Sequence, residues 1–594
     1  MKDSDQRYRC NLISMEPVDH GVRNRVSGID SQGKYVDLAP DETALLLYSN
    51  TWQTLRRHVE IYTSRYAEHT GSFSQYVEVL EKCAEAGLLV SEDDIRAKIV
   101  GSIGKDAGMT NRIEMIGIPT RNRPTELARC IESYMGNVMK YGRTPEFVVA
   151  DDSDREFLEK NRLALDILRK KYPGTISHHD ISKRKEFAHE YSKNKNVEYS
   201  IAEFTVCGDD TDQNHVGALR NFLMLYARGR KILMVDDDTI CTVHTLPGYK
   251  PTSTIESLTI SSMPPRPSWF FDSYEQAMNY FPTVDVDYLG EHEKLLGQNV
   301  SSLISQISPA DIQFDPELGG INNTLFIDIH SQALTSKKVA VTFPGIVGHS
   351  WMRAHPPTMV DHTDHPHSLW GNSEEEYRKN RSSANIARMA EGYRLYSGAE
   401  YLGVMGLDTS QPLPFFPPVG TNEDANFGYL IHTCFPQYIS GIIPYAVEHR
   451  RTHAYAPIVD TKPAPYSTWT LTTIVMESIR KNMGQENISI GKLAQTLSQL
   501  SKYPTTSIQS LVLNGIQHRL VNSLEYHRRL DAYYSHKPDY WHADTHEIIK
   551  QTEIFLQSDL SLLIPFFKDM NSIEGKKFGW EDFREWIGKW GKVL

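Results

Sequence analysis

Three short apolar runs and the helical patterns that separate them constrain the fold of this chain most strongly. The stretches "NRIEMIGIPT", "EFVVADDSD" and "KILMVDDD" each predict a buried strand, because continuous apolar runs of this length are typical of strands covered on both faces. Between the first two lies "PTELARCIESYMGNVMKYG", an amphipathic helix with Pro124 in its first turn. Strands that alternate with helices predict a parallel α/β sheet between Met109 and about Tyr455.

The chain of 594 residues is too long for one ordinary core, so we expect several domains. Residues 1–105 predict a winged-helix-like α+β module, in which "GKYVDLAPDETALLLYS" is a strand and a helix and "SFSQYVEVLEKCAEAGLLV" is a helix that ends at Gly87. Residues 106–455 are expected to form the α/β domain. Residues 456–594 form a predicted helical region that would serve packing, an oligomer interface between copies of the chain, or substrate binding.

Composition narrows the class of partner. The 75 acidic residues exceed the 63 basic ones and no basic stripe appears, which argues against nucleic acid as a partner. The six cysteines form no CxxC pair, so neither a disulfide framework nor a thiolate zinc site is indicated. No apolar stretch approaches the roughly 20 residues that a transmembrane helix needs, and the N-terminal sequence lacks a signal-peptide core. We therefore expect a cytoplasmic protein with no transmembrane segment.

Three consecutive aspartates follow the third apolar run. In an extended strand residues i and i+2 project to the same side, so Asp236 and Asp238 are expected to converge while Asp237 faces away. Two carboxylates at one point need a cation, and hard oxygen ligands suit magnesium or manganese. The position agrees, because open α/β sheets bind ligands at the carboxyl ends of their strands. The alternative is a solvated turn after a strand.

Other polar residues are expected at the same edge of the sheet, where they would meet a base and phosphates. They are Pro119, Thr120, Arg121 and Asn122 after the first strand, Asp151 and Asp152 after the second, and Arg220 and Asn221 early in the helix that leads into the aspartates. Taken alone, the pair Asp151 and Asp152 is equally explained as the start of a helix or a turn.

In this order, "IPTRNRP", "VVADDSD", "GALRN" and "MVDDD" resemble the nucleotide-sugar-dependent glycosyltransferases of the GT-A (Rossmann-like) fold. The resemblance implies that Asp236 and Asp238 hold a divalent metal, manganese or magnesium, against the diphosphate of a nucleotide-sugar, with a UDP-sugar favoured. It implies that Asp151 or Asp152 faces the base. Arg220 would stabilise the phosphates or hold the aspartates, and Asp237 would serve the sugar or the domain itself.

The stretch "FFPPVGTNEDANFGYLIH" resembles the segment of this family that carries an acidic pair before a helix. The resemblance makes Glu423 and Asp424 the candidates for the catalytic base of an inverting transfer, with Asp424 preferred. The alternative is an ordinary helix start, which would leave a retaining mechanism open.

A late histidine often completes the metal site in this family. In "PYAVEHRRTHA" the candidates are His449 and His453, and His449 is preferred because it follows an apolar strand pattern; the alternative is a structural histidine. The segment "GHSWMRAHPPTMVDHTDHPHSLWG" is predicted as a loop beside the site, with Trp351 and Trp370 as sugar or acceptor platforms. The long segment between the aspartates and "NED", including "ELGGINNTLFIDIHSQAL", is expected to shape acceptor binding.

The N-terminal module resembles PqqD-like modules, which bind a leader peptide as an added strand. This resemblance favours a peptide or protein acceptor. Two other functions stay open: a nucleotidyltransferase, and a non-catalytic peptide-binding scaffold with a degenerate GT-A domain. The first more often has a glycine-rich phosphate loop, which "IPTRNRP" lacks.

Overall fold

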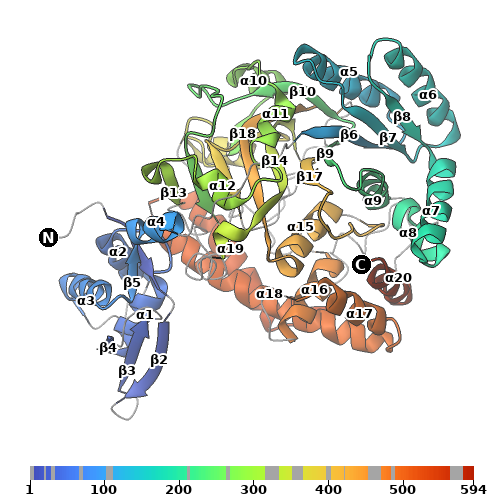
Figure 1. The fold of residues 1–594 in the computed structure, drawn as a ribbon. Helices are drawn as coiled ribbons and strands as arrows, with labels where there is room; N and C mark the ends of the chain where they lie inside the picture. Colours follow the sequence, from blue (N-terminus) through green and yellow to red (C-terminus); the bar gives the residue numbers. More distant parts are fainter. Residues whose placement is uncertain are drawn as a thin grey trace.

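Figure 1 shows a computed structural model of the chain, coloured from the N-terminus in blue to the C-terminus in red. The structure describes residues 6–594 except 12, 19–21, 29–33, 66–70, 102–111, 210–214, 262–267, 315–332, 351–364, 397–402, 421, 452–469, 483–487, 535, 562 and 564–578. The fold is mixed α/β, as predicted, with one large central sheet and helices on both of its faces.

The three strands and two helices predicted for the first half of this sheet are confirmed, and one further strand and three further helices join them. Four strands lie side by side and parallel in the order β9, β6, β7 and β8, which span Lys231–Val235, Ile113–Thr120, Glu146–Asp151 and Ile176–His179. The connecting helices are α5 (Pro124–Lys140), α6 (Arg155–Arg169), α7 (Ile181–Lys195), α8 (Tyr199–Cys207) and α9 (Val216–Tyr226). Parallel strands place their carboxyl ends at one edge, which is where the polar residues follow.

The side chains of β9 alternate between two cores, one on each face of the sheet. Ile232 and Met234 point into the core formed with α8, α9 and the C-terminal helices. Leu233 and Val235 point into the opposite core, formed with α5, α6 and residues of the N-terminal module. Since successive side chains of a strand face opposite sides, a continuous apolar run needs a core on each side.

The prediction of a parallel sheet up to about Tyr455 was wrong beyond β9, where antiparallel pairs extend the sheet. There β17 (Val404–Asp408) joins β9 to β14 (Lys338–His349), which is parallel to β18 (Tyr438–His449). The helix α15 (Glu423–Cys434) connects β17 to β18. The other elements here are β10 (Thr239–His244), β11 (Leu258–Ser261), β12 (Ser268–Phe271), α10 (Tyr274–Tyr280), α11 (Tyr288–Glu293), α12 (Val300–Ile304), β13 (Ile312–Phe314), α14 (Glu374–Ser382), β15 (Asn385–Arg388) and β16 (Tyr393–Tyr396).

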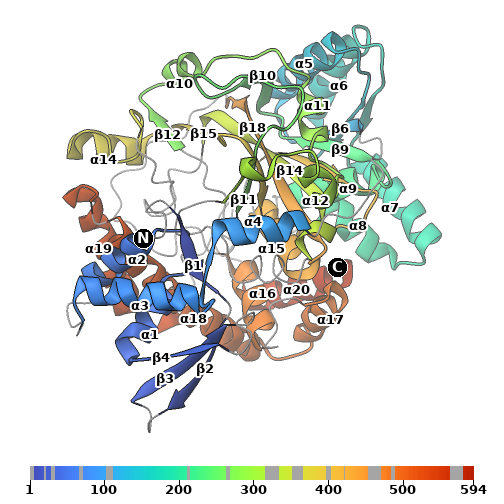
Figure 2. The same ribbon diagram turned by 60° about the vertical axis from the view of Figure 1, so that its left-hand side comes forward.

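The N-terminal residues form a small module at the lower left of Figure 1. An antiparallel sheet of β2 (Ile13–Val18), β3 (Arg23–Gly28) and β4 (Tyr35–Leu38) accompanies the helices α1 (Pro40–Tyr48), α2 (Leu55–Arg65), α3 (Phe73–Glu85) and α4 (Glu92–Gly101), and β1 (Tyr8–Cys10) pairs with β5 (Leu89–Ser91). The module is joined to the α/β part by Trp52, whose ring stacks on Phe314 at 5.5 Å. Figure 2 shows β2, β3 and β4 projecting from the rest of the chain.

The long helical patterns near the C-terminus are confirmed as helices. They are α16 (Leu471–Asn482), α17 (Ile490–Leu500), α18 (Thr505–Tyr533), α19 (Asp539–Leu556) and α20 (Trp580–Val593). They pack below the central sheet in Figure 1, where Leu493, Ile516 and Trp590 join the core with α9. An interface between copies of the chain through these helices stays a prediction. Among the described helices, none combines the length and the apolar character that crossing a membrane requires.

Candidate functional site

The ends of β6 and β9 and the starts of α9 and α15 surround a cavity of ≈ 290 Å³, which we call the carboxylate pocket. Nine of the predicted site residues line it: Pro119, Thr120, Arg121, Asp152, Arg220, Asp236, Asp237, Asp238 and Glu423. The pocket lies at the carboxyl ends of the parallel strands, as the position of the aspartates predicted.

The three aspartates do not alternate as a strand would make them. The strand β9 ends at Val235, and the chain turns there, with the Thr239 N–H donating to the Asp236 carbonyl at 3.1 Å. Arg123 Nη1 therefore reaches both Asp237 Oδ1 at 2.9 Å and Asp238 Oδ2 at 3.1 Å. The expectation that Asp237 faces away was wrong, because the alternation of an extended chain stops where the turn begins.

Asp236 is held by Arg220 from the side of α9. Arg220 Nη2 donates to Asp236 Oδ1 at 2.8 Å, and its Nε lies 3.4 Å from Glu423 Oε1. The Arg220 side chain is only 3% exposed, so it is fixed between the two carboxylates. Of the two roles left open for Arg220, the geometry therefore favours holding the carboxylates. Burial raises the pKa of Asp236 even though Arg220 opposes this shift.

Of the three aspartates, Asp238 contacts the largest number of basic side chains. His449 Nε2 lies 3.1 Å from Asp238 Oδ1, and Arg451 Nε lies 3.2 Å from Asp238 Oδ2. Burial alone would raise the pKa of Asp238, but His449 and the arginines outweigh it and hold the pKa below its usual range. The His449 Nδ1 faces the His349 carbonyl. An acceptor at each ring nitrogen favours the doubly protonated form of His449, and the pKa of His449 is raised: burial lowers it and Asp238 overcomes that effect.

Asp237 differs from Asp238 in its titration. Thr120 Oγ1 donates to Asp237 Oδ2 at 2.7 Å, and the Arg123 guanidinium contacts the other oxygen. Burial and then the adjacent charge of Asp238 raise the pKa of Asp237 to about 7. The turn thus places a carboxyl that is readily protonated beside one that stays ionised.

The predicted metal ligands have the donor types that Mn²⁺ and Mg²⁺ accept, namely carboxylate oxygens from Asp236 and Asp238 and, once Nε2 has lost its proton, an imidazole nitrogen from His449. In the part of the chain that the structure describes, however, no three His, Cys, Asp or Glu side chains converge as ligands of one ion. Arginines hold the carboxylates instead. The donor set fits a divalent ion by its chemistry, and the ion would fit best together with an anion that engages Arg123 and Arg451.

Asp152, rather than Asp151, faces the carboxylate pocket. Asp151 is 1% exposed and accepts hydrogen bonds from His178 and Asn161, both at 2.8 Å. Asp152 lines the pocket, where Arg184 donates to one oxygen at 2.6 Å and His215 lies 3.1 Å from the other. Burial would raise the pKa of Asp152, but His215 and Arg184 lower it below its usual range.

Two predicted ligand-binding asparagines hold neighbouring segments in place instead of lining the pocket. The Asn221 amide donates to the Phe416 carbonyl at 2.9 Å and accepts from the Phe416 N–H at 2.8 Å. Asn122, at a φ of 57°, donates to Asp154 at 2.8 Å and so ties the turn after β6 to the turn after β7. Neither lines the carboxylate pocket, because their polar atoms are used in these contacts.

Of the acidic pair at the start of α15, one residue lines the pocket and the other does not. Glu423 lines the carboxylate pocket, whereas Asp424 does not and accepts from the Ala425 N–H at 2.8 Å. Burial and then Asp424 raise the pKa of Glu423 to about 7, against the effect of Arg220. The preference for Asp424 over Glu423 is therefore not supported by the geometry, since adjacent residues on a helix point in different directions.

Of the two predicted aromatic platforms, the structure describes Trp370 alone. Trp351 lies outside the described residues, as do His355, His362, His453 and most of "ELGGINNTLFIDIHSQAL". Trp370 is 5% exposed and packs in a core with Trp541, with Lys537 Nζ 3.9 Å from its ring centroid. The role predicted for Trp370 was wrong, because the C-terminal helices cover this ring.

Sequence reasoning missed three polar residues of the pocket: Arg123, His215 and Arg451. Each lies next to a segment that was identified. Arg123 ends "TRNR", His215 precedes α9, and Arg451 follows His449 by two positions. A search for cations at strand and helix ends near the aspartates would have found them.

No family model matches the sequence. No curated protein matches it either.

Proposed function

We propose that this chain is a glycosyltransferase of the GT-A type that binds a nucleotide-sugar in the carboxylate pocket. One observation supports this most strongly. Segments far apart in the sequence bring five carboxylates and four guanidinium groups around one cavity at the carboxyl ends of parallel strands. Collecting so many charges in a partly buried place is costly unless a ligand uses them, so such clusters mark functional sites.

The diphosphate of the donor is assigned to Arg123 and Arg451. Their side chains are 41% and 29% exposed, so they can turn from Asp238 to a phosphate without disturbing the core. Guanidinium groups suit phosphates because their planar fork matches two oxygens. Arg220, which is buried, acts as a positioning residue for Asp236 and Glu423.

Charge balance favours joint binding of metal and nucleotide. When ionised, Asp236, Asp237, Asp238 and Glu423 are offset by three arginines and by protonated His449. A divalent ion alone would leave excess positive charge, whereas a nucleoside diphosphate supplies the missing negative charge. When bound by Asp236, Asp238 and His449, which would release its Nε2 proton, the ion would neutralise charge on the leaving diphosphate.

The nucleobase is assigned to the side of Asp152 and His215. Asp152 is held in place by Arg184, and its carboxylate can accept the ring N–H of a uracil. This contact is the reason for proposing a UDP-sugar.

Glu423 is proposed as the base of an inverting transfer. The acceptor atom, an oxygen, sulfur or nitrogen, bonds to the anomeric carbon while the bond from that carbon to the diphosphate oxygen breaks. The acceptor proton passes to Glu423, and the nucleoside diphosphate leaves. A carboxyl with a pKa of about 7 is well matched to accepting this proton near neutral pH.

A peptide or protein acceptor is proposed from the N-terminal module. Among the described strands, β2 pairs with β3 alone, and Ser14, Met15, Glu16 and Pro17 are exposed on it. An edge strand of this kind offers unpaired backbone groups to which an extended peptide can add.

The test compares Asp236→Asn and Asp238→Asn with Asp166→Asn, a control on the outside of α6 whose side chain is 62% exposed. Wild type and control are expected to hydrolyse a UDP-sugar slowly and to be stabilised against heat by UDP with Mn²⁺. Both pocket variants should lose these properties. Full turnover by either pocket variant would contradict the proposal. Pyrophosphate release from a nucleoside triphosphate and a sugar phosphate would indicate a nucleotidyltransferase, and no nucleotide-dependent stabilisation would indicate a scaffold.

A further inference from the structure

A second cavity, of ≈ 340 Å³, lies at the opposite end of α9 from the carboxylate pocket. It is bounded by Tyr191 of α7, by the last turn of α9 and the residues after it, and by the loop that follows β17. Val216 and Arg220, at the start of α9, line the first pocket, whereas Met224 and Arg228 line the second. The helix rises about 1.5 Å per residue, so the two cavities are separate sites.

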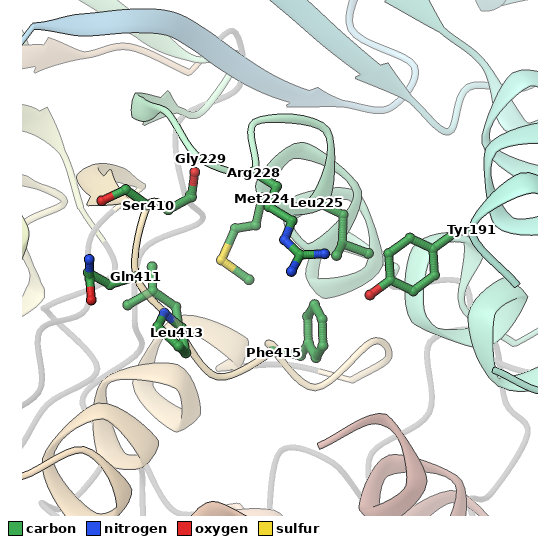
Figure 3. Close-up of a pocket in the computed structure, with 11 residues that line it drawn as sticks. Tyr191, Met224, Leu225, Arg228, Gly229, Ser410, Gln411, Leu413 and Phe415 are labelled. Carbon is green, nitrogen blue, oxygen red and sulfur yellow. The ribbon is translucent and has the colours of Figure 1, made fainter. Parts of the chain in front are cut away.

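The lining of this second cavity combines apolar side chains, one cation and the polar residues Thr409, Ser410 and Gln411. Figure 3 shows the Arg228 guanidinium among the side chains of Met224, Phe415 and Tyr191. Arg228 is exposed, and among the residues that the structure describes no carboxylate pairs with it. A guanidinium group flanked by rings and aliphatic carbon is a place where the charge of an anion and its apolar body can be bound together.

We propose that this cavity binds a small carboxylate with an apolar body, such as an aryl or short acyl acid. The carboxylate would receive the paired N–H groups of Arg228, a geometry that suits a guanidinium. The apolar part would lie against Phe415 and Met224. The volume is within the range of sites for small molecules, which is about 300–1,000 Å³.

The loop after β17, which lines the second cavity, leads on to the candidate active site. Thr409 Oγ1 lies 2.7 Å from both the Ala227 and the Arg230 carbonyl oxygens and donates its proton to one of them, and the Thr409 N–H donates to the Arg230 carbonyl at 3.0 Å, so the loop after β17 is fixed to the end of α9. The same segment passes the cavity at Phe415 and is then held at Phe416 by Asn221.

Beyond Phe416 this segment packs directly on the start of α9. The Pro417 carbonyl oxygen lies 1.8 Å from where a Cβ on Gly217 would stand, so only glycine permits the contact. The Ala218 N–H donates to the Pro418 carbonyl at 3.1 Å. Five residues later Glu423 enters the carboxylate pocket. A ligand at Arg228 therefore restrains the segment that positions Glu423, and this coupling to catalysis rests on the proposed function.

Binding is tested by calorimetry with phenylacetate, using wild type, Arg228→Gln and Arg155→Gln. Arg155 is an exposed arginine on α6 that lines neither cavity, so its substitution controls for loss of one surface charge. Wild type and Arg155→Gln are expected to bind phenylacetate alike, and Arg228→Gln at least tenfold more weakly. Phenylacetamide, which has the same shape without the charge, should also bind at least tenfold more weakly to wild type.

Three results would overturn the site: no saturable binding of phenylacetate to wild type, equal binding by Arg228→Gln, or equal binding of the amide. A tenfold preference for phenyl phosphate would overturn the assignment of the site to carboxylates.

Coupling between this cavity and the candidate active site is tested by the effect of phenylacetate on UDP-sugar hydrolysis. We expect at least a twofold change in rate or KM in wild type and none in Arg228→Gln. An unchanged rate and KM in wild type that hydrolyses the donor would refute the coupling. Absence of hydrolysis would contradict the proposed function while leaving the calorimetric result intact.

Discussion

Neutralising Asp238 and neutralising Asp237 should have very different effects on stability, although the two residues are adjacent. Asp238 contacts His449 at 3.1 Å, Arg123 at 3.1 Å and Arg451 at 3.2 Å. A hydrogen bond to a charged group contributes about 1.5–3 kcal/mol and a neutral one about 1 kcal/mol. Water compensates much of the loss at the two arginines, which are partly exposed, but not at His449, which is 14% exposed.

We therefore expect Asp238→Asn to lower the local free energy of unfolding by about 2 kcal/mol. Asp237→Asn should cost less than about 1 kcal/mol at pH 7, because the pKa of Asp237 is raised to about 7 and an amide resembles the protonated acid.

The pH dependence has opposite signs at the two positions. Because the folded state raises the pKa of Asp237, this group lowers stability as the pH rises from about 4 to about 7. The pKa of Asp238 is lowered, so its contribution is present above its unfolded value of about 4 and is lost as the pH falls through its folded value. At pH 8 the Asp237→Asn variant should be at least as stable as wild type.

Hydrogen exchange, read by mass spectrometry on peptides from β9 and β18, measures the relevant local opening at pH 6 and pH 8. Global melting is less informative for a chain of several cores. Equal losses of protection in the two variants, or a larger loss in Asp237→Asn at pH 8, would refute the electrostatic account of the turn.

Further predictions concern catalysis, cofactor binding and the N-terminal module. Glu423→Gln should lower kcat by about 10²–10⁴-fold with UDP affinity retained, and more than Asp424→Asn does; equal losses would reject Glu423 as base. The wild-type rate should rise with pH through about 7, as Glu423 loses its proton, and a pH–rate profile that is flat there would contradict this role. Calorimetry with Mn²⁺ should show at least tenfold tighter binding in the presence of UDP, and equal affinity without UDP would reject joint binding. Trp52→Ala should cost about 3–5 kcal/mol by removing a fully buried ring that stacks on Phe314, measured by hydrogen exchange in peptides from the N-terminal module, with exposed Tyr35→Ala as the control; similar protection in both variants would show that the stack contributes little.

The sequence was informative where one local pattern has one physical solution. The apolar runs of β6, β7 and β9 needed a core on both sides, and the amphipathic α5 supplied part of it. Gly87, with a φ of 76°, follows α3 as expected of a residue that tolerates the left-handed conformation. The end of β18 at His449 followed from its apolar pattern in the same way.

Contacts between distant segments were not encoded in any local pattern. Asp237 turned toward Arg123 because the strand ends one residue before the first aspartate, and no periodicity marks that boundary. Trp370 is buried in a core because residues of α19, more than 160 positions later in the sequence, pack over it.

The sequence by itself determined the central α/β architecture and the edge of the sheet where the polar residues gather, because strand periodicity and strand direction are local properties. Only the tertiary structure decided which charges meet. Glu423, and not Asp424, lines the pocket, and Asn221 donates to the Phe416 carbonyl instead of facing a ligand. The aspartates pair with Arg123, Arg220 and Arg451. Pairing of buried charges depends on distances between segments far apart in the chain, and the folded arrangement alone sets those distances.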